Sequence, residues 1–305
     1  MTLPGPFGTP SRLTAVVAVI VAAAAVLAVV LLGAGIAQTG TGELRIPAAG
    51  TTALLRFLVL AGLAVQVGEL AGGRIAGAGP RPRAFSVPAA LLAAGASAGL
   101  LILLAAVSGL SLPVVYGLRE GRLLLVTANA FLLAALCAAS RRPALAVAPL
   151  AVAVLSEALR AHPEPTTPAI GTALTVVHLT GASLWCGTLL YVLRTMRLRR
   201  GGREVLARYA RMAAVVYAAL AVTGTVSTLR RLPLDAVLTS AYGRVLLVKL
   251  LLFGGVSLLA LAARTRMLAG GDAESPARVE VACLGVITAV SALLTVVPDP
   301  HWLTP

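Results

Sequence analysis

Nine long apolar runs make up most of this chain of 305 residues. They lie near residues 13–37, 52–71, 87–110, 123–139, 143–159, 169–193, 212–229, 241–263 and 279–297. A helix needs roughly 17–25 mostly apolar residues to cross the hydrocarbon core of a bilayer. Inside that core the backbone must satisfy its own hydrogen bonds, and the chain shows no alternating segments of about ten residues, which are typical of a membrane barrel. The sequence therefore predicts an all-α, polytopic transmembrane helical bundle of about nine helices.

The basic residues follow the gaps between these runs. A net charge of +14 would by itself suggest a nucleic-acid partner, but only Lys249 is a lysine and the arginines are sorted by gap. Sixteen basic residues lie before the first run and in alternate gaps, six lie in the other gaps, and three lie within runs. The positive-inside rule then places the sixteen in the cytoplasm, the N-terminus inside and the C-terminus outside. The charge reflects topology, and no nucleic-acid partner is expected.

The first run raises the question of a signal peptide. It has about 25 apolar residues, whereas a signal core has about 7–15. We therefore expect a retained signal-anchor helix, while cleavage would leave eight spans in the same orientation. The three cysteines all fall within runs, so a disulfide framework is not expected.

The chain divides into two regions of different character. Residues 1–156 are N-terminal apolar helices, five spans counting the run at 143–159, and they contain no motif. Residues 157–305 carry more polar and aromatic side chains, so chemistry is sought there. The chain shows no internal repeat, and an inverted-repeat transporter is therefore not supported. Pro149 lies inside a short run and is expected to kink its helix.

Three histidines are the candidate metal ligands, and the topology places all of them on the outer side. They are His162 in a loop, His178 inside the sixth run and His301 in the tail. A neutral imidazole is a common ligand of copper and zinc, and an ionisable residue inside a membrane suggests a function. The alternative for His178 is a hydrogen bond to a neighbouring helix, and both interpretations remain open. The alternative for His301 is a solvated residue of the tail that binds no metal.

Further polar residues lie within the spans. Trp185 follows His178 by seven residues and so shares its helix face, although packing alone would explain it. Lys249 lies well inside its span and should need a partner, and by depth Glu157 suits it better than Glu69. Such an ion pair is either structural or part of gating or proton coupling. No nucleophile–base pair or carboxylate dyad can be built from the spacing, so an enzyme is not expected.

Three segments resemble the CopD copper-resistance family. The stretch from His162 through His178 and Trp185 to Gly187 resembles its paired-histidine segment. Ala241-Tyr242-Gly243-Arg244, followed by Val-Leu-Leu-Val-Lys249-Leu, resembles its PYGRLLLLKL segment and is the most specific match. Arg208-Tyr-Ala-Arg211 resembles the start of its next helix, and Arg278-Val-Glu280 its last helix. The resemblance covers roughly residues 157–300.

The resemblance implies an integral inner-membrane protein that handles copper and imports it, with a periplasmic or extracellular copper carrier as a partner. His162 and His178 match the two histidines of the family as copper ligands. Tyr242, Arg244, Lys249 and Trp185 match motif positions without an assigned role. The chain departs from the pattern around both histidines, at Ala161, Pro163, Cys186 and Thr188.

Copper transport meets one difficulty in this sequence. Cu(I) prefers soft sulfur ligands, yet Met196, Met212 and Met267 all lie at the cytoplasmic edge of the spans, and no methionine-lined pathway can be drawn. Two alternatives therefore stay open. One is a non-transporting membrane partner in copper delivery or oxidase assembly, and the other is a haem-bearing electron carrier, for which a single deep histidine is too few.

Overall fold

A computed structural model describes residues 12–160, 167–198, 203–233, 235–271 and 274–298, and all regular elements in these ranges are helices. The α-helices of the N-terminal region are α1 (Arg12–Gln38), α2 (Ala49–Ala76), α3 (Ser86–Ser108), α4 (Leu112–Gly117), α5 (Arg119–Ala139) and α6 (Val147–Arg160), the last preceded by the 3-10 turn η1 (Pro143–Ala146). Those of the C-terminal region are α7 (Pro168–Met196), α8 (Arg203–Arg231), α9 (Ala236–Thr239), α10 (Ala241–Leu268) and α11 (Glu274–Leu294).

Nine helices in the described ranges are long and apolar enough to cross a membrane. They correspond one by one to the nine apolar runs, with η1 and α6 together forming the fifth span, Pro143–Arg160. The prediction of an all-α polytopic helical bundle is therefore confirmed. The short helices α4 and α9 lie in the connections between spans.

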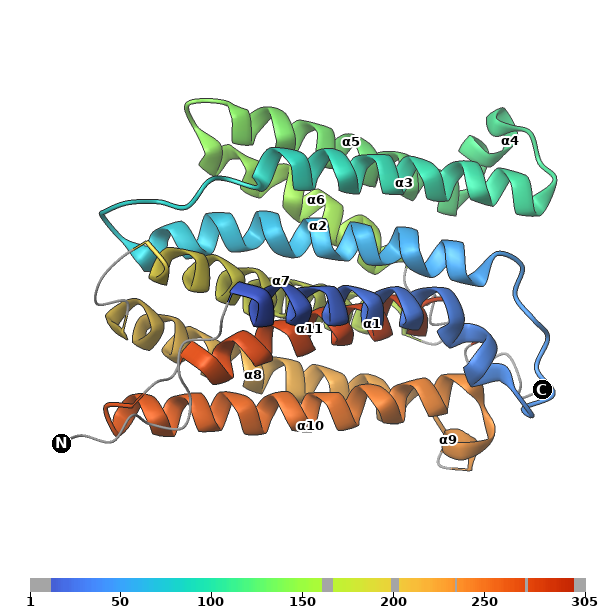
Figure 1. The fold of residues 1–305 in the computed structure, drawn as a ribbon. Helices are drawn as coiled ribbons and strands as arrows, with labels where there is room; N and C mark the ends of the chain where they lie inside the picture. Colours follow the sequence, from blue (N-terminus) through green and yellow to red (C-terminus); the bar gives the residue numbers. More distant parts are fainter. Residues whose placement is uncertain (1–11, 161–166, 199–202, 234, 272–273, 299–305) are drawn as a thin grey trace.

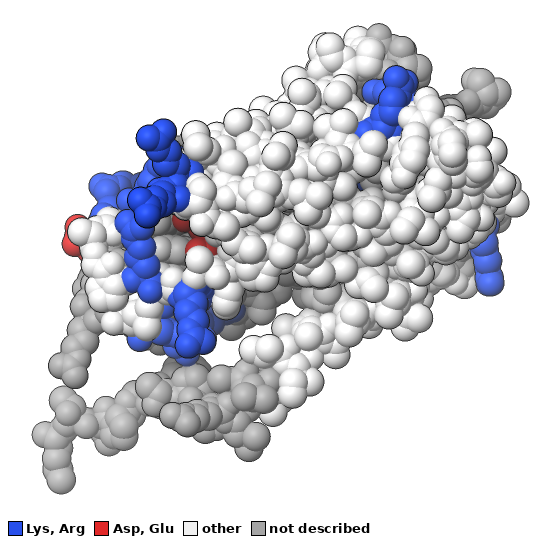
Figure 2. Space-filling model, turned by 90° about the horizontal axis from the view of Figure 1, so that it is seen from above, with Lys and Arg blue, Asp and Glu red and all other residues white. Residues whose placement is uncertain are grey.

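The long helices lie side by side and alternate in direction, as Figure 1 shows. Each long helix therefore stops at the end of the bundle where the next long helix starts. This is so for α2, α5, α7 and α10. Figure 2 shows that Lys and Arg side chains gather at one end, with a broad white band between the ends. We call this the arginine-rich end and define it by Arg74, Arg81, Arg83, Arg141, Arg142, Arg194, Arg197, Arg208, Arg211, Arg264, Arg266 and Arg278. We call the opposite end the arginine-poor end.

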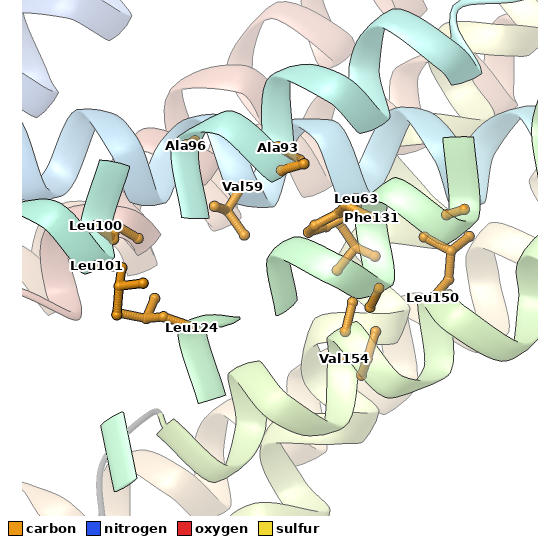
Figure 3. Packing of buried hydrophobic residues seen from close by; sticks show 14 of the residues in the cluster. Val59, Leu63, Ala93, Ala96, Leu100, Leu101, Leu124, Phe131, Leu150 and Val154 are labelled. Atoms are coloured by element: carbon orange, nitrogen blue, oxygen red, sulfur yellow. The ribbon is translucent and has the colours of Figure 1, made fainter. Parts of the chain in front are cut away.

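Buried apolar side chains form three clusters. The first joins α2, α3, α5 and α6, and Figure 3 shows Leu63, Phe131 and Leu150 packed within it. The second joins α1 and α2 to α10 and α11, and the third joins α2, α7, α8, α10 and α11. Helix α2 contributes to all three clusters, so it connects the N-terminal helices to the C-terminal ones.

Helices α2 and α7 approach so closely that only glycine fits at their crossing. A Cβ atom added to Gly187 would lie 1.7 Å from the carbonyl oxygen of Ala64, and one added to Gly68 would lie 2.1 Å from the carbonyl carbon of Gly187. Small residues at helix crossings allow such contact between backbones in membrane proteins. The crossing therefore fixes the position of α7, which carries His178 and Trp185.

Pro149 lies in the first turn of α6, after the four residues of η1. A proline is tolerated in the first turn of an α-helix because the backbone N–H that it lacks has no helical partner there. The fifth span therefore departs from α-helical geometry at Pro143–Ala146, ahead of Pro149, and the expected kink at Pro149 is not the feature that divides it.

Candidate functional site

His178 lies on α7, ten residues after Pro168. At about 1.5 Å per residue this is roughly 15 Å from the arginine-poor end of the helix. Its side chain is half-buried, and its Nδ1 lies 3.0 Å from the hydroxyl oxygen of Thr223 on α8. His178 therefore contacts a neighbouring helix, and the contact links α7 to α8. Metal binding by His178 stays a prediction.

The hydroxyl of Thr223 decides which nitrogen of His178 carries the proton. This hydroxyl donates to the carbonyl oxygen of Ala219 at 2.7 Å, in the preceding turn of α8. We assign the proton of the neutral imidazole to Nδ1, because a hydroxyl that donates to Ala219 can only accept from the ring. Nε2 then keeps its lone pair, which is the form in which an imidazole binds a metal ion.

Lys249 lies on α10, eight residues after Ala241, and is half-buried. It is near enough to His178 to act on it electrostatically. Within the described parts of the chain, Lys249 forms no ion pair and no hydrogen bond through its side chain. None of the described carboxylates therefore neutralises the charge of Lys249 beside the histidine.

The other two histidines of the sequence analysis, His162 and His301, lie outside the described residues. We expect His162 to lie close enough to His178 to share one ion, and this stays a prediction. Among the residues that the structure describes, no group of three or more His, Cys, Asp or Glu side chains is placed to hold a metal ion. His178 is thus the one predicted ligand whose surroundings are known.

Trp185 is buried between α7, α8, α10 and α11. Its indole Nε1–H donates to Glu280 Oε1 of α11 at 2.8 Å. Its ring meets Tyr217 and Phe253 edge-on, with centroids 5.8 and 6.0 Å away, and these two rings stack on each other at 5.1 Å. Tyr209 of α8 is buried beside this group. Trp185 thus both packs and holds an acidic side chain inside the bundle.

The segment from Ala241 to Arg244 fixes the start of α10. The hydroxyl of Ser240 accepts from the backbone N–H of Gly243 at 3.0 Å and so caps the helix. Gly243 is required because a Cβ atom there would lie 2.2 Å from the carbonyl oxygen of Val237. Tyr242 is buried in the second cluster. The segment most similar to the copper-resistance family therefore shapes the arginine-poor end of α10.

The side chain of Arg244 extends to the last residues of α1 and the connection that follows them. Its guanidinium donates to the carbonyl oxygens of Thr39 at 2.7 Å, Leu238 at 3.0 Å and Ala37 at 3.3 Å. Carbonyl groups at the end of a helix lack helical partners, so a cation there stabilises them. Arg244 thus ties the end of α1 to α9 and α10.

Removing this guanidinium should loosen the arginine-poor end of the bundle. Arg244→Met should lower the free energy of unfolding by about 1–3 kcal/mol, because three carbonyl groups lose a charged donor. Arg244→Lys should recover only part of this loss, since an ammonium group lacks the planar fork of five donors. Thermal unfolding of the purified variants in detergent measures both, and equal melting temperatures for Arg244→Met and the unchanged protein would contradict the assignment.

The in-span carboxylates are paired differently from expectation. Glu157 bonds Arg160 at 3.0 Å on its own helix, and Arg160 also bonds Glu120 at 3.2 Å. Glu69 bonds Arg194 at 2.6 Å near the arginine-rich end. The expected partnership of Glu157 with Lys249 is therefore not formed, because Glu157 has an arginine one helical turn away.

Two residues of this site were not singled out as candidates from the sequence. Glu280 lies at the edge of the apolar run that begins at residue 279. Helix α11 begins earlier, at Glu274, so Glu280 lies within the helix and not at its start. Thr223 is one of many hydroxyl residues in the spans and is 45 residues from His178. The available signal for Glu280 was the indole N–H of Trp185, since a buried indole donor needs an acceptor.

A family model described as copper resistance protein D matches residues 203–297, which run from the start of α8 to the end of α11. The match includes Arg208, Arg244, Lys249 and Glu280, so the resemblance inferred from the sequence is confirmed for this stretch. It begins after His162, His178 and Trp185. No curated protein and no solved structure matches the chain.

Proposed function

We propose that this chain is an integral membrane protein that imports copper ions across the cytoplasmic membrane with the help of outer-side histidines. The observation that carries the proposal is His178, whose Nδ1–H bonds Thr223 so that Nε2 remains free to bind a metal ion. Thr223 belongs to the stretch similar to copper resistance protein D. Copper is the cargo here, and the proposal involves no catalytic reaction.

The orientation follows from the charges at the two ends. Cytoplasmic loops carry an excess of Lys and Arg, so we assign the arginine-rich end to the cytoplasm. The N-terminus is then inside and the C-terminus outside, and His178 lies in the outer half of its span. A copper ion arriving from outside would reach His178 about one third of the way across.

A second ligand is needed to hold an ion at this place. We propose His162, which precedes α7 by a few residues and is joined to it by the short 163–168 connection. His301 in the tail would lie on the same side. A periplasmic or extracellular copper carrier would deliver the ion to these histidines. Copper handling is thereby assigned to residues 157–305, with residues 1–156 as a supporting region.

Lys249 favours a second candidate function. A positive charge beside His178 that pairs with no described carboxylate repels a bare cation, and no three-ligand group exists in the part of the chain that the structure describes. Both observations fit a membrane partner that receives copper for delivery or oxidase assembly and does not conduct it. Uptake of copper into vesicles containing the purified protein separates the two functions, since the partner would bind copper without accumulating it inside.

The first test is copper accumulation in cells that make equal amounts of each variant in the membrane. Cells with the unchanged protein should accumulate more copper than empty cells, and His178→Ala should remove this excess because the ion loses its in-span ligand. Asn129→Ala is the matched control, since Asn129 is also a polar in-span residue but lies on α5, and its one hydrogen bond within the described ranges is to Leu125 of its own helix. Equal copper in all four strains would exclude import.

A further inference from the structure

The acidic side chain of Glu280 is buried inside the membrane-spanning part of the bundle. It lies on α11 six residues after Glu274, roughly 9 Å along the helix from its arginine-rich end. The residue is only 3% exposed. An ionisable residue in such a place is costly for the fold and usually serves a function.

Glu280 differs from the other in-span carboxylates in having no positive partner among the residues that the structure describes. Glu69 and Glu157 each bond an arginine, at 2.6 and 3.0 Å. Glu280 accepts a hydrogen bond from the neutral indole of Trp185, and no ion pair joins it to a lysine or arginine in the described ranges. A buried carboxylate with one neutral donor is poorly stabilised, whereas a protonated carboxyl group can accept the same hydrogen bond at far lower cost.

Among the described residues, the titratable groups that act on Glu280 are two thiols and a phenol, none of which can carry a positive charge. They are the thiol of Cys186 on α7, the phenol of Tyr209 on α8 and the thiol of Cys283 on α11. The Tyr209 hydroxyl is buried near the carboxyl group and near the indole of Trp185, and it carries no positive charge. These surroundings hold the carboxyl group without supplying a compensating charge.

Polar side chains continue from this level toward the arginine-poor end. Trp185 contacts Tyr217, whose hydroxyl lies 3.3 Å from that of Ser257 on α10. Lys249 and the His178–Thr223 pair lie further along the same helices. Helices α7, α8 and α10 thus carry polar groups at successive depths. Glu280 of α11 lies nearest the arginine-rich end.

We propose that Glu280 takes up and releases a proton inside the membrane, with Trp185 holding the carboxyl group in place, and that this proton movement is coupled to copper import. The coupling rests on the proposed function, whereas the protonation does not. In the uptake step the carboxylate oxygen gains a proton from water on one side, and in release the same O–H bond breaks to water on the other side. No oxidant or reductant is involved.

Infrared difference spectroscopy of the full chain in lipid vesicles tests the protonation without copper. The unchanged protein should show the carbonyl band of a protonated carboxylic acid near neutral pH, and this band should vanish on raising the pH. Glu280→Gln, which keeps an acceptor for Trp185, should remove the band. Glu204→Gln should retain it, because Glu204 is exposed and pairs with Arg208 at the surface. A band unchanged in Glu280→Gln would overturn the proposal.

Trp185→Phe provides a second variant that leaves the carboxyl group in place. Accepting a hydrogen bond weakens a carbonyl bond, so loss of the indole donor should shift the band to higher frequency. A band at the same frequency would show that Trp185 does not hold the protonated group.

Copper uptake into the same vesicles tests the coupling. A pH gradient with the interior alkaline should increase copper accumulation by the unchanged protein, and Glu280→Gln should reduce the gradient-dependent part to background. Accumulation that does not respond to the gradient would overturn the coupling. If no copper enters under any gradient while the infrared band is present, the import proposal fails and the protonation of Glu280 stands.

Discussion

Gly187→Ala should unfold a large part of the protein although it adds a single methyl group. The new Cβ atom would lie 1.7 Å from the carbonyl oxygen and 2.6 Å from the carbonyl carbon of Ala64, and 3.0 Å from the Cα atom of Gly68. All three atoms belong to the backbone of α2, so no side-chain rotation relieves the contact. Helices α2 and α7 would have to separate, and we expect a loss of about 3 kcal/mol or more. Thermal unfolding in detergent, followed by circular dichroism, measures this loss.

The crossing offers both a reciprocal variant and a matched control. Gly68→Ala should cause a similar loss, since its Cβ atom would meet the backbone of Gly187. Gly95→Ala on α3 adds the same methyl group to a helix at a position with no atom within 4 Å. It should leave the melting temperature unchanged or raise it slightly, because alanine favours helix. If Gly187→Ala and Gly95→Ala had the same melting temperature, the close approach of α2 and α7 would be wrong.

The spans could be predicted because their signal is local. An apolar run long enough to cross a bilayer is visible without knowing what it packs against. The ends of the helices were less predictable, since charged residues can extend a helix past the apolar run. Helix α8 begins at Arg203 within an expected loop, and α11 begins at Glu274 before the apolar run. The extension of α8 carries Tyr209 into the bundle, and that of α11 places Glu280 more than one turn from the start of its helix.

The partners inside the site could not be predicted, because they depend on which helix faces meet. His178 stands out in the sequence as a rare ionisable residue within a span, but any hydroxyl residue of a neighbouring helix could have been its partner. Depth alone suggested Glu157 for Lys249, yet these residues lie on α6 and α10, which belong to different packing clusters. Glu157 and Arg160 are three residues apart on one helix, so their pairing is the local solution.

Arg160→Met should cause the second large loss of stability. Its side chain is 3% exposed and bonds both Glu157 and Glu120, while Arg56 of α2 lies 3.7 Å from the same Glu120. The four side chains carry two positive and two negative charges, so removing one arginine leaves a buried carboxylate with no counter-charge at bonding distance. We expect a loss of about 3–5 kcal/mol, measured by thermal unfolding in detergent.

The charge balance, and not the bulk of the arginine, is the expected cause of this loss. The double variant Glu157→Gln, Arg160→Met restores electrical balance and should therefore be more stable than Arg160→Met alone. Glu204→Gln breaks an ion pair whose carboxylate side chain is 81% exposed, and it should change little because water screens such a pair. A double variant as unstable as Arg160→Met would show that packing of the arginine side chain dominates. The buried cluster would then be a packing element that happens to be charged, and the charged residues of the N-terminal region would have no electrostatic role in holding α2, α5 and α6 together.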